Sequence, residues 1–242
     1  MKQVHLSLQG KGGVGKSLIA SLLAQYYESI GEPAACLDTD PVNATFAGYA
    51  ALNVEHLPLL GPDKKISERK FDGMMERILT EDRNFVIDNG ASSFVPLSSY
   101  LVENDAAAMI AENGKQLVVH SVVTGGQALG DTVHGLNSLL EQMPASVRIV
   151  VWINEFFGPV ERDGRPFEQL GIYKDNKERI HGVVRLERQS SDTFRKDLET
   201  LLDAKMTFAE ALDPASDKFG LMPRQRLMQM QRSLFQRIAL VV

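Results

Sequence analysis

Short runs of apolar residues alternate with stretches of helical spacing along most of this chain. The apolar runs show no polar alternation, which is typical of strands buried on both faces of a sheet. Six such runs predict strands, over residues 4–8, 33–38, 85–88, 116–123, 148–153 and 182–186. A regular order of strand and helix predicts a mainly parallel, twisted sheet with helices on both faces.

Helical spacing is clearest in residues 68–79. Phe71, Met74, Met75 and Ile78 recur there three or four positions apart, so they share one face of a helix. Further helices are predicted over residues 16–28, 128–143, 167–179, 191–202 and 224–239, and helical material over residues 97–112. Residues 157–166 are predicted to form a surface loop. We expect one α/β domain over residues 1–242.

Glycines are concentrated where the first predicted strand meets the first predicted helix. The run Gly10-Lys11-Gly12-Gly13-Val14-Gly15-Lys16-Ser17 matches the phosphate-binding pattern G-x-x-x-x-G-K-S/T. Glycines let backbone N–H groups converge on phosphate oxygens, and the N-terminal end of the following helix attracts the anion. We expect Lys16 to reach the β- and γ-phosphates, Ser17 to bind Mg²⁺, and Leu18 to contact the nucleotide. The alternative is a glycine-rich turn without a ligand.

Two of the predicted strands end in carboxylates. Asp38 and Asp40 close the second strand, and Asp88 closes the third, which reads as a Walker B strand. The carboxyl ends of parallel strands form the edge where open α/β sheets bind ligands. We expect Asp88 to hold Mg²⁺ through water, because Mg²⁺ keeps several of its own waters. The alternative for Asp38 and Asp40 is a cap on the following turn.

Lys11 adds a second lysine to the glycine-rich loop. With it, the loop resembles the deviant Walker A motif of the ParA/MinD superfamily of P-loop ATPases. This resemblance implies ATP and Mg²⁺ as ligands and a homodimer that forms on ATP binding, in which Lys11 reaches the nucleotide of the other subunit. It also implies that Asp40 orients the attacking water and that Asp38 lies near the Mg²⁺ shell. Asn89-Gly90 departs from the family's usual Asp-x-Pro, which leaves the geometry of that segment open.

Asn154 directly follows the fifth predicted strand. It resembles the family's asparagine that contacts adenine, and an amide can both donate and accept, as the adenine edge requires. A GTP site of the N-K-x-D type needs aspartate where this chain has Phe157, so ATP is favoured. The next strand lacks the family's Ile-Pro, and a turn asparagine without a ligand is the alternative.

Over nearly its full length the chain is most similar to the conjugal-transfer and plasmid-stability proteins TraL and StbB. Residues 8–17, 38–46 and 87–97 carry this resemblance. It implies a slow, partner-stimulated ATPase that acts as a dimeric switch in plasmid stability, partition or conjugative transfer, with a plasmid-encoded partner protein. The alternatives are a MinD-like membrane-associated positioning ATPase, a nucleotide-binding scaffold with negligible turnover, and an ATP-dependent ligase of the same superfamily.

Charge and surface patterns bear on the partners. The formal net charge of −5 is not that of a dedicated nucleic-acid binder. Arg185, Arg188, Arg195 and Lys196 keep non-specific DNA binding open, although a solvated face is favoured. The predicted last helix carries an apolar stripe that is comparable to a membrane-binding helix, but packing on its own domain is favoured. The stripe consists of Leu227, Met230, Leu234 and Ile238.

The chain has a single cysteine, Cys36. One cysteine excludes a disulfide within the chain and disfavours an iron–sulfur redox protein, which needs more cysteine ligands per subunit. This fits a cytoplasmic protein, and no stretch approaches the length of a membrane-spanning helix. We expect Cys36 to be an inert core residue and His120 to be a hydrogen-bonded core histidine.

Overall fold

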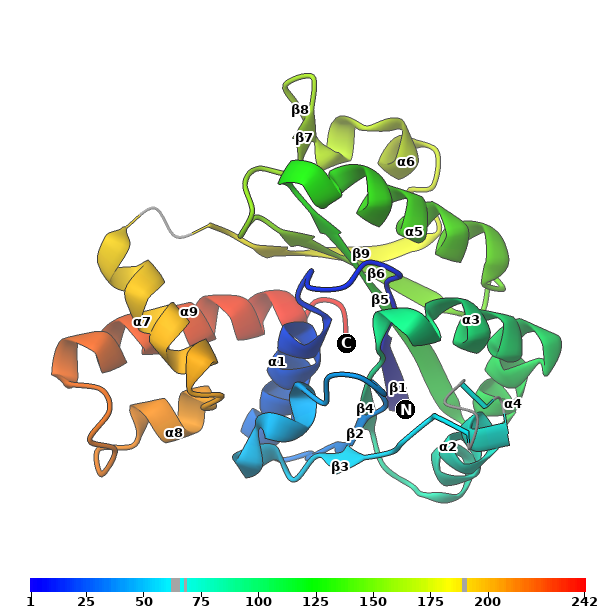
Figure 1. The fold of residues 1–242 in the computed structure, drawn as a ribbon, viewed down its shortest axis with the longest axis horizontal. Coiled ribbons are helices and arrows are strands. Elements are labelled where there is room, and N and C mark those ends of the chain that lie inside the picture. Colours follow the sequence, from blue (N-terminus) through cyan, green and yellow to red (C-terminus); the bar gives the residue numbers. More distant parts are fainter. Residues whose placement is uncertain (62–65, 68, 189–190) are drawn as a thin grey trace.

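A computed structural model describes residues 1–61, 66–67, 69–188 and 191–242. In this part of the chain a seven-stranded sheet has the order β3-β2-β4-β1-β5-β6-β9, and every pair of neighbours is parallel (Figure 1). Its strands are β1 (Lys2–Ser7), β2 (Ala35–Asp38), β3 (Glu55–His56), β4 (Phe85–Asp88), β5 (Lys115–Thr124), β6 (Arg148–Asn154) and β9 (Ile180–Leu186). The predicted parallel sheet is confirmed, and β1 lies in its middle.

Helices cover both faces of the sheet, as predicted (Figure 1). One face carries α2 (Arg69–Thr80), α3 (Phe94–Glu103), α4 (Ala106–Glu112) and α5 (Leu129–Gln142). The opposite face carries α1 (Lys16–Ser29), α7 (Asp192–Asp203), α8 (Phe208–Leu212) and α9 (Leu221–Ile238). The sheet therefore separates two apolar cores.

The alternation of side chains along each strand explains the two cores. Successive residues of a strand point to opposite faces, so Val4 and Leu6 join the core under α2 to α5, while His5 contacts α1 on the other side. In β6 the same alternation sends Ile153 to the first core and Trp152 to the second. Because both faces are covered, both sets are apolar and the sequence shows no simple polar alternation.

The helix α2 matches its prediction closely. Its four apolar residues at helical spacing are all buried, and its described part begins at Arg69; the predicted first residue, Glu68, lies outside the described residues. At its other end, the buried ammonium of Lys115 donates to the carbonyls of Ile78 and Glu81. A cation there compensates the exposed carbonyls and the negative end of the helix dipole.

The helical material predicted over residues 97–112 is present, but it is interrupted. The chain forms two helices, α3 and α4, that are separated at Asn104 and Asp105. Asp105 has a φ of 49°, in the left-handed region that a continuous right-handed helix cannot contain. Aspartate is one of the few non-glycine residues that occupy this region readily.

The helix predicted over residues 167–179 is wrong. Only a 3₁₀ turn, Phe167–Gln169, and the one-turn helix α6 (Gly171–Lys174) form there. Phe167 is buried, but residues 174–179 are all charged or polar and offer no apolar face that packing could stabilise. The preceding loop contains the hairpin of β7 (Glu161–Arg162) and β8 (Arg165–Pro166), whose two-residue turn is Asp163-Gly164 with φ angles of 54° and 70°. These values suit a type I′ turn.

The apolar stripe of α9 packs on its own domain, as the sequence favoured. Leu227 and Ile238 are buried in the second core, and Met230 and Leu234 pack against it. Among the described residues, none of the helices combines the length and the apolar character that crossing a bilayer requires.

Cys36 is buried, and this burial raises the pKa of its thiol to about 12, in keeping with an inert core residue.

Candidate functional site

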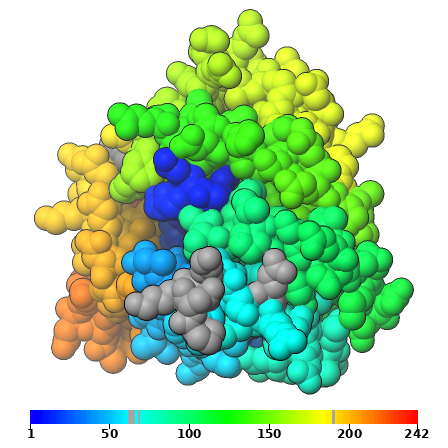
Figure 2. All heavy atoms as spheres, turned by 45° about the vertical axis from the view of Figure 1, so that its right-hand side comes forward, coloured from blue at the N-terminus to red at the C-terminus, as the bar shows by residue number. Residues whose placement is uncertain are grey.

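The glycine-rich loop lies at the carboxyl end of the central strand β1. Its neighbours are β4 on one side and β5 on the other; β2, β3 and β4 lie on the β4 side of β1, and the chain then crosses to β5, β6 and β9 on the other side, so the strand order reverses at β1. Crevices at such a switch point are where open α/β sheets bind ligands. In Figure 2 the blue N-terminal segment reaches the surface here, bordered by green segments. The side chains predicted to bind ATP and Mg²⁺ therefore meet at one edge of the sheet.

Backbone geometry accounts for the glycines of this loop. Gly13 and Gly15 have φ angles of 72° and 106°, which residues with a Cβ rarely adopt. A Cβ on Gly15 would also lie 2.9 Å from Nδ2 of Asn154. Gly15 is the N-cap of α1 and has no side chain to cap it, so the first N–H groups of this helix face the loop. They form an anion-binding end of the helix.

Lys16 lies in the first turn of α1 and is 8% exposed. Its Nζ donates to the carbonyl oxygen of Lys11 at 3.1 Å, across the loop. Burial lowers the pKa of Lys16, whereas the nearby carboxylates of Asp88 and Asp40 act in the opposite direction. The lysine is thus held between the loop and two acidic side chains, at the position expected for a phosphate ligand.

Asp88 ends β4 and is almost completely buried. Burial raises the pKa of this carboxyl to about 6, although hydrogen bonds from Ser17 and Ser7 and the charge of Lys16 oppose the rise. The Ser7 hydroxyl donates to Oδ1 of Asp88 at 2.9 Å. A carboxylate beside the Ser17 hydroxyl is an oxygen donor set that suits Mg²⁺. Within the described residues no group of three or more His, Cys, Asp or Glu side chains could hold a metal, and a nucleotide-bound Mg²⁺ does not require one.

Asp38 and Asp40 organise the loop that follows β2. The two carboxylate oxygens of Asp38 accept from the backbone N–H of Asp40 at 3.0 Å and of Ala47 at 2.9 Å, and burial raises the pKa of Asp38. Oδ1 of Asp40 accepts from Val42 N at 2.9 Å and Asn43 N at 3.1 Å, so this aspartate also stabilises a turn. Unlike Asp38, Asp40 lines the cavity beside the phosphate loop.

Gly90 lies against Asp40. A Cβ at Gly90 would come within 2.8 Å of Cγ of Asp40, although the backbone conformation there, φ −61° and ψ 155°, is open to any residue. The glycine is therefore required for close approach of the two loops, one after β2 and one after β4.

Sequence reasoning missed the polar residues that join the three strand ends. Oγ1 of Thr39 lies 2.9 Å from both the carbonyl oxygen of Asp88 and Oδ1 of Asn89. Nδ2 of Asn89 donates to the carbonyl oxygen of Ser7 at 3.3 Å. These contacts fix the ends of β1, β2 and β4 relative to one another. In the sequence, these residues are visible only as polar residues directly at the ends of apolar strands. Their hydrogen-bond partners are 49 to 82 positions away, so no local pattern pairs them.

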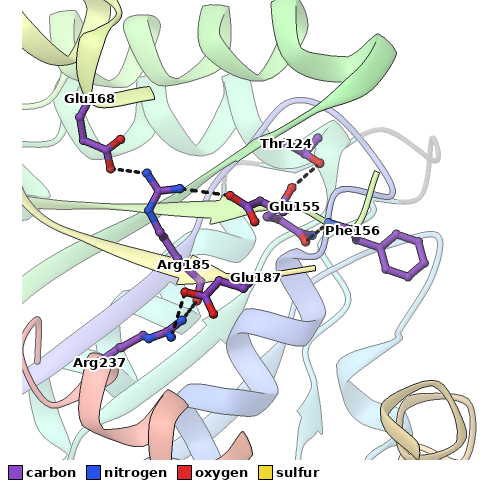
Figure 3. A network of polar contacts seen from close by, with 8 residues as sticks. Thr124, Glu155, Phe156, Glu168, Arg185, Glu187 and Arg237 are labelled. Carbon is purple, nitrogen blue, oxygen red and sulfur yellow. Dashed lines mark hydrogen bonds and ion pairs between the residues drawn. The ribbon is translucent and has the colours of Figure 1, made fainter. Parts of the chain in front are cut away.

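Asn154 lies at the end of β6, beside the phosphate loop, and is 6% exposed. Its Nδ2 donates to the carbonyl oxygen of Val14 at 2.9 Å, and its Oδ1 accepts from Phe156 N at 3.1 Å. The Thr124 hydroxyl donates to the carbonyl oxygen of Asn154 at 2.8 Å (Figure 3). Asn154 thus connects the sheet to the phosphate loop.

Two adjoining cavities open at this edge of the sheet. One, of about 630 Å³, is lined by Gly12, Lys16, Ser17 and Asp40 together with the loop after β4. The other, of about 760 Å³, extends between α1, α7 and α9 and includes Asn154. The two share Gly13, Gly15, Leu18, Tyr49 and Leu202. The space is sufficient for a molecule with an anionic end and a less polar body.

Lys11 points away from this cavity. Its Nζ forms an ion pair of 2.8 Å with Oδ2 of Asp131 in the first turn of α5, and the side chains are 45% and 62% exposed. His120 is buried and hydrogen-bonded to His5 and Trp152, which confirms its expected role as a core residue. The predicted site residues therefore converge at one edge, apart from the Lys11 ammonium.

Comparisons with known proteins identify relatives of the whole chain. No family model matches the sequence. Two proteins of Escherichia coli, both named Protein TraL, are 47% identical to it over 238 and 235 residues, which cover 98% and 97% of this chain and 98% and 96% of theirs. In the solved MinC:MinD cell division protein complex of Aquifex aeolicus, one chain shares the fold with a TM-score of 0.50 and 13% identity, over 98% of this chain and 96% of that chain. Close identity along almost the entire length of both relatives shows that this protein belongs to the TraL family, built on a MinD-like fold.

Proposed function

We propose that this protein binds ATP with magnesium, hydrolyses it slowly, and acts as a dimeric switch in plasmid stability, partition or conjugative transfer. The convergence of Lys16, Ser17, Asp40 and Asp88 at the N-terminal end of α1 carries the proposal. A buried lysine facing two carboxylates beside capless helix N–H groups matches the needs of a magnesium-bound triphosphate. The 47% identity to TraL proteins supports the plasmid-related role.

Each residue of the site has a task in this proposal. The loop N–H groups and Lys16 bind and orient the phosphates, and Ser17 and Asp88 hold Mg²⁺, with Asp38 near its shell. Bound Mg²⁺ supplies positive charge to the phosphate oxygens. Asp40 orients the attacking water, since phosphoryl transfer depends mainly on positioning and charge neutralisation. Asp40 already has one oxygen committed to the turn after β2, which holds the carboxylate in place.

The dimer part of the proposal rests on Lys11. Its ion pair with Asp131 is solvent-exposed, and exposed pairs contribute about 1 kcal/mol or less to stability. The lysine can therefore leave Asp131 at small cost and reach the phosphates of a second copy. Association of the two copies would then change the surface to which a partner binds.

We infer that the partner is a plasmid-encoded protein, because the surface gives less support to DNA or a membrane. Arg185 is paired with Glu155 and Glu168, and Arg195 with Asp192 and Glu199, so these arginines carry little uncompensated charge for DNA. The apolar stripe of α9, which a membrane-bound state would need, is packed in the second core. Both observations leave a protein as the main candidate for the partner that binds one nucleotide state of the switch.

Calorimetry with MgATP tests the proposal most directly. Lys16→Ala should weaken ATP binding by roughly 10- to 100-fold, because a charge-assisted contact to phosphate is lost. Val95→Ala is a matched surface control, since Val95 is 67% exposed and lies outside both cavities. The absence of ATP binding by the wild-type protein would overturn the proposal.

Turnover separates the switch from a scaffold that only holds nucleotide. Phosphate release should be slow for the protein alone and should rise when the plasmid partner protein is added. Double-stranded DNA and anionic lipid vesicles, each added in a parallel reaction, test whether DNA or a membrane stimulates hydrolysis instead. Tight ATP binding with no phosphate release under any of these conditions would identify the scaffold instead.

A further inference from the structure

The cavity of about 760 Å³ continues directly from the phosphate loop. Gly13, Gly15 and Leu18 line it as well as the phosphate cavity, so a nucleotide held by its phosphates directs its nucleoside into this space. Its walls on that side include Leu198 and Leu202 of α7. An apolar wall next to an anion-binding loop suits a flat aromatic base.

The Asn154 side chain is largely committed to the protein itself. Its acceptor oxygen takes the N–H of Phe156 at 3.1 Å, and its amide donates to Val14 at 2.9 Å. To accept from the amino group of a base, this oxygen would have to share or lose the Phe156 contact. Asn154 therefore fixes the backbone that follows it, and that backbone carries an exposed aromatic pair.

Phe156 and Phe157 are exposed aromatic residues at the mouth of the cavity. They are 59% and 54% exposed, and their ring centroids lie 4.9 Å apart with the planes nearly perpendicular. Both line the larger cavity. Exposed aromatic rings beside a ligand cavity indicate a binding contact, since a phenylalanine contributes most to stability when it is buried.

The segment that carries Phe156 is fixed to β9. The Glu155 N–H donates to the carbonyl oxygen of Leu186 at 3.0 Å, and the Glu155 carboxylate accepts from Arg185 at 3.2 Å. Arg185 also donates to Glu168, and Arg237 of α9 donates to the carbonyl oxygen of Arg185 at 2.8 Å. Figure 3 shows the Phe156 ring pointing away from this network. The ring is thus presented from a fixed backbone, which reduces the entropy lost on binding.

We propose that Phe156 stacks on the purine base of the nucleotide whose phosphates the glycine-rich loop holds. This rests on the proposed function and adds a base contact from a residue outside the glycine-rich loop and the acidic strand ends. Stacking uses the π-face that every base presents, so Phe156 strengthens the binding of ATP and GTP equally and does not select between them.

Calorimetry with two probes separates the base from the phosphates. Phe156→Ala should bind MgATP roughly 5- to 150-fold more weakly, while its affinity for magnesium tripolyphosphate stays within about twofold of wild type. Phe156→Leu should resemble the alanine variant, and Phe156→Trp should retain or exceed the wild-type affinity for ATP. Val95→Ala should leave both affinities unchanged.

The Phe156→Trp variant provides a second readout. Its added tryptophan fluorescence should be quenched by MgATP and not by magnesium tripolyphosphate, because only ATP carries a base. Unchanged ATP affinity in Phe156→Ala, or a loss confined to Phe157→Ala, would overturn the stacking assignment and leave the proposed function intact. A wild-type protein that binds neither probe would overturn the proposed function and the stacking together.

Discussion

At the scale of residues, a chain of buried hydrogen bonds joins β6, β5 and β1 to α1. The Trp152 indole can only donate, so Nδ1 of His120 accepts from it at 2.9 Å and Nε2 of His120 carries the hydrogen. That nitrogen donates to Nδ1 of His5 at 2.8 Å, and Nε2 of His5 then donates to the Tyr27 oxygen at 2.7 Å. One donor-only residue thus sets the tautomer of both histidines.

Both histidines are neutral in the folded protein. Burial lowers the pKa of His5 from 6.5 to about 3 and that of His120 well below its usual value. The unfolded chain therefore binds more protons than the folded chain between pH 6.5 and 3. The contribution of His5 to stability is complete above pH 6.5 and is lost progressively as the pH falls toward 3.

This predicts that His5→Asn flattens the acid dependence of stability. Below pH 6.5 the free energy of unfolding of the wild type should fall by up to about 1.4 kcal/mol per pH unit for each buried histidine. The slope of the variant should lack the contribution of His5. Urea unfolding at pH 7, 6 and 5 measures these slopes. The exposed His134, as His134→Gln, is the control, and equal slopes in all three proteins would contradict the prediction.

A second residue-scale prediction concerns Gly90. Gly90→Ala should displace the Asp40 carboxylate, because its Cβ would lie 2.8 Å from Cγ of Asp40 without straining the backbone. We expect ATP binding close to wild type and hydrolysis slower by roughly 10- to 100-fold, since a misplacement of about 1 Å has such effects. Phosphate release under saturating ATP measures this. Gly73→Ala, whose Cβ meets nothing within 4 Å, should keep the wild-type rate.

At the scale of elements, the apolar stripe of α9 is compatible in sequence with binding to a membrane or with packing on the protein's own core. Leu227 is fully buried in the second core, and the ion pair of Arg226 with Asp197 at 2.5 Å joins α9 to α7. Arg237 adds a hydrogen bond to β9. Packing and these polar contacts together hold the helix on its own domain.

Leu227→Ala should therefore destabilise the protein by about 2–4 kcal/mol, as expected for a large-to-small change in a core. Leu221, in the first turn of the same helix, is 80% exposed, and Leu221→Ala should change the stability by less than about 0.5 kcal/mol. Chemical denaturation measures both. A Leu227→Ala protein that keeps its stability and loses binding to anionic vesicles would mean that α9 serves a membrane.

At the scale of the whole molecule, the proposed switch depends on a second copy. Lys11→Ala should keep ATP binding, because Lys16 and the loop N–H groups remain, but it should stay monomeric with ATP. Asp40→Ala should accumulate as an ATP-bound dimer, since it binds but does not turn over. Light scattering with MgATP measures both states. Asp131→Asn, which removes only the intrachain partner of Lys11, should still dimerise, and a dimeric, fully active Lys11→Ala protein would contradict the cross-subunit contact.

The sequence by itself determined the parallel sheet, the position of the glycine-rich loop between the first strand and the first helix, and the acidic ends of two strands. These features are local: the left-handed conformations at Gly13 and Gly15 and the apolar run before Asp88 are encoded in a few contiguous residues. The helix prediction over residues 167–179 failed because the polar and charged residues there lack an apolar face. The left-handed conformation of Asp105 divides the predicted helical material of residues 97–112 into α3 and α4.

Only the tertiary structure decided which distant groups meet. It pairs Lys11 with Asp131, and it joins Asn154 to Val14, 140 positions away. It also brings Phe156 to the mouth of a cavity whose opposite walls come from α1, α7 and α9. Such contacts depend on how helices pack across both faces of the sheet. No short segment of sequence contains that information, because the residues next to each partner in the chain fit many tertiary arrangements.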